Sequence, residues 1–266
     1  MGYEEILTEM EDGVLTLTLN RPEKLNAWTY QMASELGEAI GQGNDDEEVD
    51  AFVVTGAGRG FCAGADVKAL FKTQAEKGQV DRRGDDLLPW VDLLRASKPI
   101  VAAINGACIG VGLSQLMPMD VLVASRNAKL SFRFIKMGLI PELGSSRFLL
   151  ARTGFGHASK LMLSGETIDA KEAERIGLVD LVTEPEELLD VARRTARSMG
   201  ENPPAAVRAV KQLLTENMSE SDLALVQRRE LEALNESYKT PEHLEAIDAF
   251  LEKREPDFKR ARRNRS

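Results

Sequence analysis

The sequence predicts an α/β fold with a helical C-terminal part, and two observations carry this prediction. Over the first two-thirds of the 266 residues, short apolar runs alternate with helical patterns. After about residue 145 the pattern is helical. Alternating strands and helices favour parallel strands joined by crossover helices. We therefore expect an α/β core over residues 1–200 and a helical part over residues 201–266.

Several strands and one helix are expected in the core. Residues 14–19 alternate apolar and polar side chains with a period of two, which indicates a strand with one buried face. A helix is expected over 29–41, where Met32, Leu36 and Ile40 recur at a spacing of four. Short apolar runs predict further strands at 51–55, 99–104, 120–124 and 129–132. Charges and glycines interrupt the pattern over 71–88, so we expect a loop or loose helix there.

The helices of the second half are marked by their end signals. Asp169 and Glu172 form an N-cap with a carboxylate at the third helical position, and Gly177 is a stop signal. A last helix begins with Thr240 as cap and Pro241 in its first turn, and runs to about residue 254. Helices are also expected over 185–199, 203–216 and 219–238.

Composition excludes several classes of protein. The net charge of -9 is unfavourable for general nucleic-acid binding, although the segment from residue 253 to 266 carries seven basic and two acidic residues. That tail is either a solvated end or a contributor to binding an anion. Two cysteines without a disulfide pattern and an acidic start without an apolar segment favour the cytoplasm. The two histidines are far apart in the sequence, so we expect no metal site. The sequence has no run of 18 apolar residues, so we expect no membrane span.

Two loops of small residues could carry chemistry. Residues 61–67 and 105–112 each follow a predicted strand, and small residues let the backbone approach a ligand closely. If both loops lie at neighbouring strand ends, each can supply one N–H to the same oxygen, as in an oxyanion hole. Tight packing of helix on strand explains the same residues equally well. A dinucleotide fingerprint starting at Gly56 is excluded, because it needs glycine at position 61, where Phe61 stands.

Taken together, these segments resemble the enoyl-CoA hydratase/isomerase family, also called the crotonase family. The resemblance covers nearly the whole chain, and is carried by residues 19–27, 60–67, 98–112, 137–141, 170–182 and 250–254. It implies a crotonase-like spiral of βα turns with a helical C-terminal trimerisation part, assembled as a homotrimer or a dimer of trimers. It also implies an acyl-CoA thioester as substrate in fatty acid or related metabolism. No cofactor is expected beyond the coenzyme A of the substrate.

The resemblance also implies the residues of the site. The backbone N–H groups of Ala63 and Val111 would form the oxyanion hole for the thioester carbonyl and stabilise the enolate. Coenzyme A would be bound by residues from both loops, from the preceding turn and from the C-terminal helix: Lys24, Leu25, Ala27, Ala65, Asp66, Val67, Gly110, Phe250 and Lys253.

The expected reaction follows from a departure from the hydratase pattern. Family hydratases activate a water with two glutamates, whose positions are Ser114 and Phe134 here. Glu142 instead lies in a Pro-Glu-x-x-Ser-Ser segment like that of the family's Δ3,Δ2-enoyl-CoA isomerases, where this glutamate is the base. We therefore expect an isomerase, in which Phe134 and apolar neighbours raise the pKa of Glu142 by desolvation. A carboxylate that only interacts with a helix dipole is the alternative interpretation of Glu142.

Other functions remain open at this point. A hydratase with a different acid/base group, a non-catalytic acyl-CoA-binding protein and an RNA-binding member of the family are the alternatives. A dehalogenase ranks low, because it needs an aspartate near Glu142. Cys62 is interpreted as a packing residue rather than a nucleophile, while Trp28 and Arg59 are either ligand contacts or ordinary core and surface residues.

Overall fold

A computed structural model describes residues 2–66 and 89–263 of the chain. The expected loop over 71–88 and the site residue Val67 lie outside the described residues. The chain divides into two compact units, residues 1–197 and 198–266.

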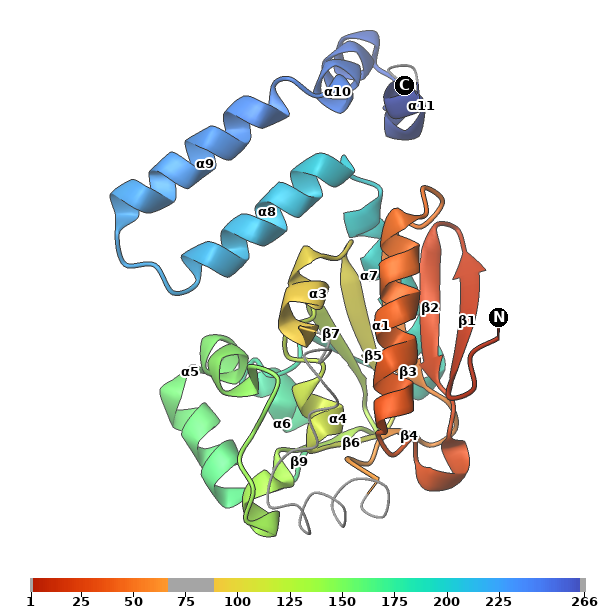
Figure 1. Ribbon diagram of the computed structural model, residues 1–266, viewed down its shortest axis with the longest axis vertical. Helices are drawn as coiled ribbons and strands as arrows, with labels where there is room; N and C mark the ends of the chain where they lie inside the picture. The colour runs from red at the N-terminus through yellow and green to blue at the C-terminus, as the bar shows by residue number, and fades with distance from the viewer. Residues whose placement is uncertain (1, 67–88, 264–266) are drawn as a thin grey trace. The chain divides into compact units, whose positions relative to one another are not determined.

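The first unit contains two β-sheets with helices between the strands (Figure 1). Its strands are β1 (Ile6–Glu11), β2 (Val14–Leu19), β3 (Ala51–Gly56), β4 (Gly60–Cys62), β5 (Ile100–Ile104), β6 (Ala107–Ile109), β7 (Val121–Ser125), β8 (Lys129–Ser131), β9 (Ile168–Asp169) and β10 (Leu181–Thr183). Its helices are η1 (Pro22–Lys24), α1 (Tyr30–Asp45), α3 (Trp90–Ala96), α4 (Val111–Ser114), η2 (Arg133–Met137), α5 (Ser145–Ser164), α6 (Ala170–Arg175), η3 (Pro185–Glu187) and the first part of α7 (Leu188–Gly200).

The larger sheet has six strands in the order β1-β2-β3-β5-β7-β10. Only β1 and β2 pair antiparallel, and the other neighbours are parallel. Successive side chains of β2 point to opposite faces of the sheet, and each face is covered by a helix. Leu15 faces α1, because a Cβ placed on Gly43 would lie 3.2 Å from its side chain. Thr16 points to the other face, where its hydroxyl accepts a hydrogen bond from Arg193 of α7 at 3.2 Å.

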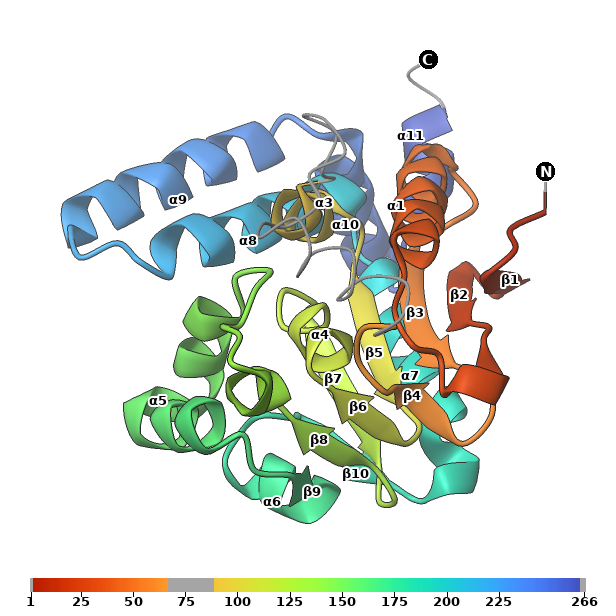
Figure 2. The same cartoon turned by 60° about the horizontal axis from the view of Figure 1, so that its bottom comes forward.

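The smaller sheet, in the order β4-β6-β8-β9, makes the fold a spiral (Figure 2). Three successive turns each run along one strand of the large sheet, bend, and add one strand to the small sheet: β3 then β4, β5 then β6, and β7 then β8. The bends stack closely. A Cβ on Gly106 would lie 2.2 Å from the Arg59 carbonyl oxygen, and the Asn105 side chain donates to the carbonyl of Gly56 at 2.8 Å. Only glycine fits at Gly106, so sequence and spiral are matched here.

The expected elements of the core are found, with ends shifted by a few residues. Thr29 caps α1, accepting from the Met32 N–H at 3.0 Å, and Asp169 caps α6, accepting from the Glu172 N–H at 2.9 Å. Gly177 follows α6 with a φ of 78°, as expected for a helix stop. Strands β1, β4, β6, β9 and β10 and helix α3 were not predicted. The strands β4, β6, β9 and β10 carry too few residues to show a period, and β1 is exposed beyond its first residue, so it has no buried face to reveal it.

The second unit is entirely helical over its described residues. It contains the end of α7, then α8 (Pro204–Asn217), α9 (Leu223–Ser237), α10 (Pro241–Glu252) and α11 (Phe258–Arg263). The Thr240 side chain caps α10 by accepting from the His243 N–H at 3.2 Å, as expected. Within this single chain the apolar side chains Leu244, Ile247, Phe250 and Leu251 of α10 are exposed. None of the described helices of either unit is long and apolar enough to cross a membrane.

Candidate active site

The candidate site lies where three turns of the spiral leave the small sheet. Parallel strands β4, β6 and β8 end at Cys62, Ile109 and Ser131, so the segments that follow them start at the same edge. The segment after β4 holds Ala63 and Ala65, and the segment after β6 holds Val111. Ligands in α/β proteins commonly bind beyond the carboxyl ends of parallel strands.

The loops after β4 and β6 are in direct contact, as the sequence led us to expect. A Cβ on Gly112 would lie 2.5 Å from the Cys62 carbonyl oxygen, and a Cβ on Gly64 would lie 3.3 Å from the Ile109 carbonyl oxygen. The Gly110 N–H, in turn, donates to the Ser131 carbonyl at 2.8 Å. Glycine at these positions therefore allows three neighbouring backbone segments to converge.

The Ala63 N–H is not a free donor in this structure. It donates to the Leu25 carbonyl oxygen at 3.0 Å, and so fastens the loop after β4 to the turn after β2. Val111, by contrast, is the first residue of α4, and the first N–H groups of a helix have no partner within that helix. The Ala63 N–H is therefore already used within the fold, whereas the expected donor at Val111 stays a prediction.

Ala65 has the orientation that Ala63 lacks. Trp28 and Ala65 form a parallel bridge, in which the Trp28 N–H donates to Gly64 and the Asp66 N–H donates to Trp28. Backbone N–H groups alternate in direction along an extended segment. The Ala65 N–H therefore points away from Trp28, and no backbone acceptor for it occurs among the described residues.

The two positions that the resemblance matched to the hydratase glutamates carry no acid. Ser114, the last residue of α4, is fully buried, and its hydroxyl has no hydrogen-bond partner. Phe134, in η2, is 9% exposed and belongs to the hydrophobic core. A buried hydroxyl and a phenyl ring cannot hold and activate a water as two carboxylates would.

Glu142 lies just before α5, in a turn with an unusual backbone. Leu143 and Gly144 have φ values of 56° and 69°, and the Ser145 N–H closes the turn on the Glu142 carbonyl at 3.1 Å. A Cβ on Gly144 would lie 3.3 Å from Val91 of α3, and the indole N–H of the adjacent Trp90 donates to the Gln115 carbonyl at 2.9 Å. Helix α3 thus connects the turn of Glu142 to the end of α4.

The electrostatics of Glu142 differ from those of an ordinary helix-end carboxylate. A helix N-terminus stabilises negative charge and would lower the pKa. Desolvation by the surrounding protein instead raises the pKa of Glu142 above its usual value. Glu142 is nevertheless exposed to solvent in the single chain. The direction of this pKa shift agrees with the expectation from the sequence.

The residues expected to bind coenzyme A fall into two groups. Lys24, Leu25 and Ala27 lie beside the loop after β4: Lys24 Nζ is 3.3 Å from the Asp66 carboxylate, and Leu25 accepts the hydrogen bond from Ala63. Phe250 and Lys253 lie in the second unit, where Phe250 is exposed and Lys253 ends α10 with a φ of 55°.

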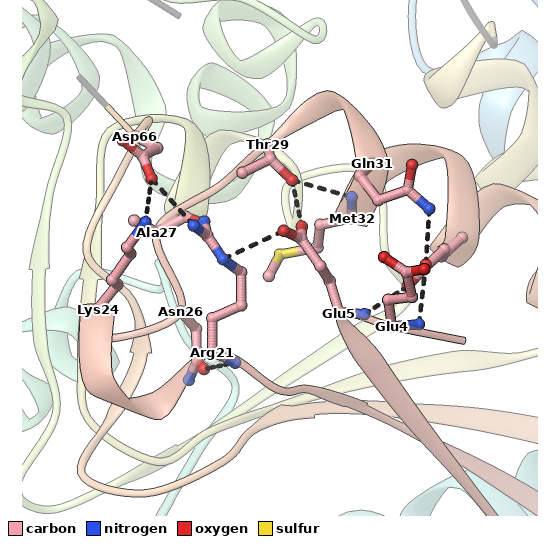
Figure 3. A network of polar contacts seen from close by, with 11 residues as sticks. Glu4, Glu5, Arg21, Lys24, Asn26, Ala27, Thr29, Gln31, Met32 and Asp66 are labelled. Atoms are coloured by element: carbon pink, nitrogen blue, oxygen red, sulfur yellow. Dashed lines mark hydrogen bonds and ion pairs between the residues drawn. The ribbon is translucent and has the colours of Figure 1, made fainter. Parts of the chain in front are cut away.

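The side chain of Arg21 was missed by sequence reasoning. It contacts Ala27 and Asp66, which belong to the two segments assigned to the ligand (Figure 3). The family-like stretch over 19–27 contains this arginine, but nothing in the sequence marks a partner 45 residues away.

Two other expectations concern reactive groups. Burial raises the pKa of the Cys62 thiol to about 12, so at neutral pH it carries no thiolate for nucleophilic attack. Within the described part of the chain, no three His, Cys, Asp or Glu side chains gather in a way that could hold a metal ion.

The comparisons with known proteins agree with this geometry. The spiral of paired strands, with two small-residue loops at one sheet edge, is the crotonase fold. The model of the enoyl-CoA hydratase/isomerase family matches residues 9–261. A probable enoyl-CoA hydratase of Mycobacterium tuberculosis is 36% identical over 261 residues, covering 97% of this chain and 99% of the relative.

An isomerase and a solved structure are also among the similar proteins. The 1,2-epoxyphenylacetyl-CoA isomerase of Escherichia coli is 32% identical, covering 96% of this chain and 98% of its own. A crystal structure of an enoyl-CoA hydratase from Bacillus anthracis superposes with a TM-score of 0.85 at 28% identity, covering 96% of this chain and 99% of that one. The chain belongs to the enoyl-CoA hydratase/isomerase family.

Proposed function

We propose that the protein is an enoyl-CoA isomerase that shifts a Δ3 double bond of an acyl-CoA to Δ2. The observation that carries the proposal is the placement of acidic groups. Ser114 and Phe134 stand where hydratases carry two glutamates. Glu142 has a raised pKa, and its turn contacts α3, which also bonds to the end of α4. One carboxylate is sufficient to isomerise, because the same group removes and returns a proton.

In the proposed reaction, the Glu142 carboxylate takes a proton from C2 of a 3-enoyl-CoA. The C2–H bond breaks, and its electrons form a dienolate that extends from the thioester oxygen to C4. Glu142 then returns the proton at C4, which leaves the double bond between C2 and C3. The coenzyme A belongs to the substrate, and we propose no further cofactor.

We propose that the Val111 and Ala65 N–H groups bind the thioester oxygen. Negative charge grows on this oxygen as the dienolate forms, so two fixed donors stabilise the transition state more than the ground state. Ala65 takes the place that the sequence assigned to Ala63, because the Ala63 N–H already donates to Leu25. The proposed acyl-CoA contacts of Lys24, Leu25, Ala27, Asp66 and Gly110 lie on the same segments.

Hydration is the second candidate function. The relative of Mycobacterium tuberculosis is named as a hydratase, and at 36% identity the two chains share most of their architecture. A hydratase here would have to use an acid/base group other than the residues at positions 114 and 134. The two functions are separated by comparing both reactions on one enzyme preparation.

The test measures isomerisation of trans-3-enoyl-CoA and hydration of trans-2-enoyl-CoA with short, medium and long acyl chains. We expect isomerisation to be the faster reaction, and Glu142→Gln to lower its kcat by about 10²-fold, the usual scale for a general base. Glu166→Gln is the matched control, since Glu166 follows the other end of α5 and pairs with Lys160 at 2.8 Å.

Two outcomes would overturn the isomerase proposal. Rapid hydration that is unaffected by Glu142→Gln would identify a hydratase with a different acid/base group. If neither reaction occurs and deuterium does not enter C2, the protein binds acyl-CoA without catalysis.

A further inference from the structure

The Arg21 side chain lies beside the loop after β4, which carries the proposed donor Ala65. Its side chain is 12% exposed, and its guanidinium reaches three separate segments of the chain. The Nε is 3.2 Å from the Glu5 carboxylate, Nη1 donates to the Ala27 carbonyl at 2.5 Å, and Nη2 donates to Asp66 at 3.0 Å (Figure 3). The planar guanidinium fixes the directions of these bonds, which a lysine ammonium does not.

Each of these contacts belongs to a segment that is itself held in place. The Arg21 N–H donates to the Asn26 side chain at 2.8 Å, and Asn26, which is fully buried, donates to the Ala57 and Gly60 carbonyls. Glu5 also accepts a hydrogen bond from Thr29, the cap of α1. Arg21 is therefore anchored on the start of β4, in the small sheet, and on the cap of the first helix.

The contact between Arg21 and Asp66 lies next to Ala65, the proposed donor to the thioester oxygen of the substrate. Asp66 directly follows Ala65, and its carboxylate is 11% exposed between Arg21 and Lys24. Its N–H donates to the Trp28 carbonyl at 2.9 Å, which fixes the peptide on the C-terminal side of Ala65. The peptide that carries the Ala65 N–H is fixed on its other side, where the Gly64 carbonyl accepts a hydrogen bond from the Trp28 N–H at 2.8 Å. Asp66, held by Arg21 and by Trp28, closes the same bridge from the residue that follows Ala65.

We propose that Arg21 is a positioning residue for the oxyanion hole, acting through Asp66 on the Ala65 N–H. The inference rests on the proposed function, because it assumes that Ala65 binds the thioester oxygen. A hydrogen-bond donor displaced by a fraction of an ångström polarises the carbonyl less and stabilises a developing oxyanion less, whereas the contacts with coenzyme A still bind the substrate. Loss of Arg21 therefore affects turnover more than substrate affinity.

The test is the infrared stretch of a thioester carbonyl labelled with carbon-13, in hexanoyl-CoA bound to wild type and to Arg21→Gln. Hexanoyl-CoA has no double bond to shift, so the bound state persists during the measurement. We expect wild type to lower the carbonyl frequency relative to water, and Arg21→Gln to lose at least half of that shift. In parallel, kcat for isomerisation should fall by about 10-fold or more, while KM changes by less than about threefold.

Arg95→Gln is the matched control for a lost buried ion pair. Arg95 pairs with Asp120 at 2.8 Å with similar burial, 13% and 15% exposed, and Asp120 binds the N–H at the opposite end of β5 from the site. We expect it to lower stability without changing the carbonyl frequency. Asp66→Asn supplies a second route to the same loss if Arg21→Gln does not fold, and Arg21→Lys should retain part of the shift.

The outcomes separate this inference from the proposed function. If wild type does not lower the carbonyl frequency, the oxyanion hole itself is wrong. If wild type lowers it and Arg21→Gln lowers it equally, only the positioning role is wrong. A rise in KM with an unchanged frequency also overturns the role, since Arg21 would then act on coenzyme A binding alone.

Discussion

At the scale of the residue, the decisive feature is a carboxyl group kept from full solvation. Glu142 is placed before a helix, where the dipole favours its charged form, yet desolvation raises its pKa. A base with a raised pKa accepts a proton from carbon more readily. The same environment makes the ionised form costly for the folded state, so the proposed catalytic role of Glu142 and the stability of the fold oppose each other.

This opposition predicts a stability effect whose sign depends on pH. The folded-state pKa of Glu142 is raised, so the folded protein binds the proton more tightly than the unfolded chain does. Wild type therefore loses stability as the pH rises from the unfolded pKa through the folded pKa. We expect Glu142→Gln, which carries no charge, to have a higher Tm than wild type at pH 8 and an equal Tm near pH ~4.

The measurement is a Tm series between these pH values by calorimetry. Glu166→Gln serves again as the control and should show no such pH-dependent gain. A Glu142→Gln variant less stable than wild type at pH 8 would show that the carboxylate makes favourable contacts in the folded protein.

At the scale of the element, very short segments are decisive. Strands β4 and β6 hold three residues each, and the four-residue helix α4 begins directly after Gly110, whose φ of 57° and ψ of -123° suit glycine. Such elements have little stability of their own. They are held by the contact of Gly112 with Cys62 and by the bond from Ala63 to Leu25.

This arrangement predicts different effects for two neighbouring N–H groups. Replacing Ala65 by lactic acid exchanges its N–H for an ester oxygen without changing the side chain. We expect kcat to fall by about 10²-fold or more with little change in the denaturation midpoint. The same replacement at Ala63 should cost about 1 kcal/mol of stability, because it removes the bond to Leu25, and leave kcat largely unchanged.

Steady-state kinetics and urea denaturation of both ester variants check this prediction. If the ester at Ala63 abolishes turnover while the ester at Ala65 does not, the assignment of Ala65 is wrong. The oxyanion donor is then Ala63, as the sequence resemblance implied.

At the scale of the whole molecule, helix α10 of the C-terminal unit exposes several large apolar side chains. Phe250 is 82% exposed and Leu251 is 72% exposed in the single chain, and Leu244 and Ile247 lie on the same helix, α10. Contiguous exposed apolar residues commonly mark interfaces between proteins. The homotrimer, or dimer of trimers, that the family resemblance implies stays a prediction.

Light scattering at micromolar concentration tests this prediction. We expect an oligomer for wild type and a shift towards monomer for Phe250→Glu, because a carboxylate in an apolar interface is costly to bury. Asp248→Asn, which changes an exposed residue of the same helix, should leave the mass unchanged. A monomer for wild type at this concentration would contradict the assignment of α10 to an interface.

The sequence by itself determined four strands of the large sheet, several helices and the family. Strand β2, the cap of α1 at Thr29 and the cap of α6 at Asp169 follow from period and capping chemistry, which depend on residues a few positions apart. The resemblance also placed the two small-residue loops at one site. The roles proposed for Glu142 and Val111 come from the family resemblance, and they stay predictions.

The tertiary structure alone decided which backbone donors are free and what holds them. Whether the N–H of Ala63 or of Ala65 is available depends on bonds to Leu25 and Trp28, which come from a different turn of the spiral. The bond from Arg21 to Asp66 likewise joins residues 45 positions apart. Local sequence fixes the conformation that a short segment prefers. The direction of a single N–H is fixed only when distant segments are packed against it, because hydrogen bonds form between atoms that folding brings together.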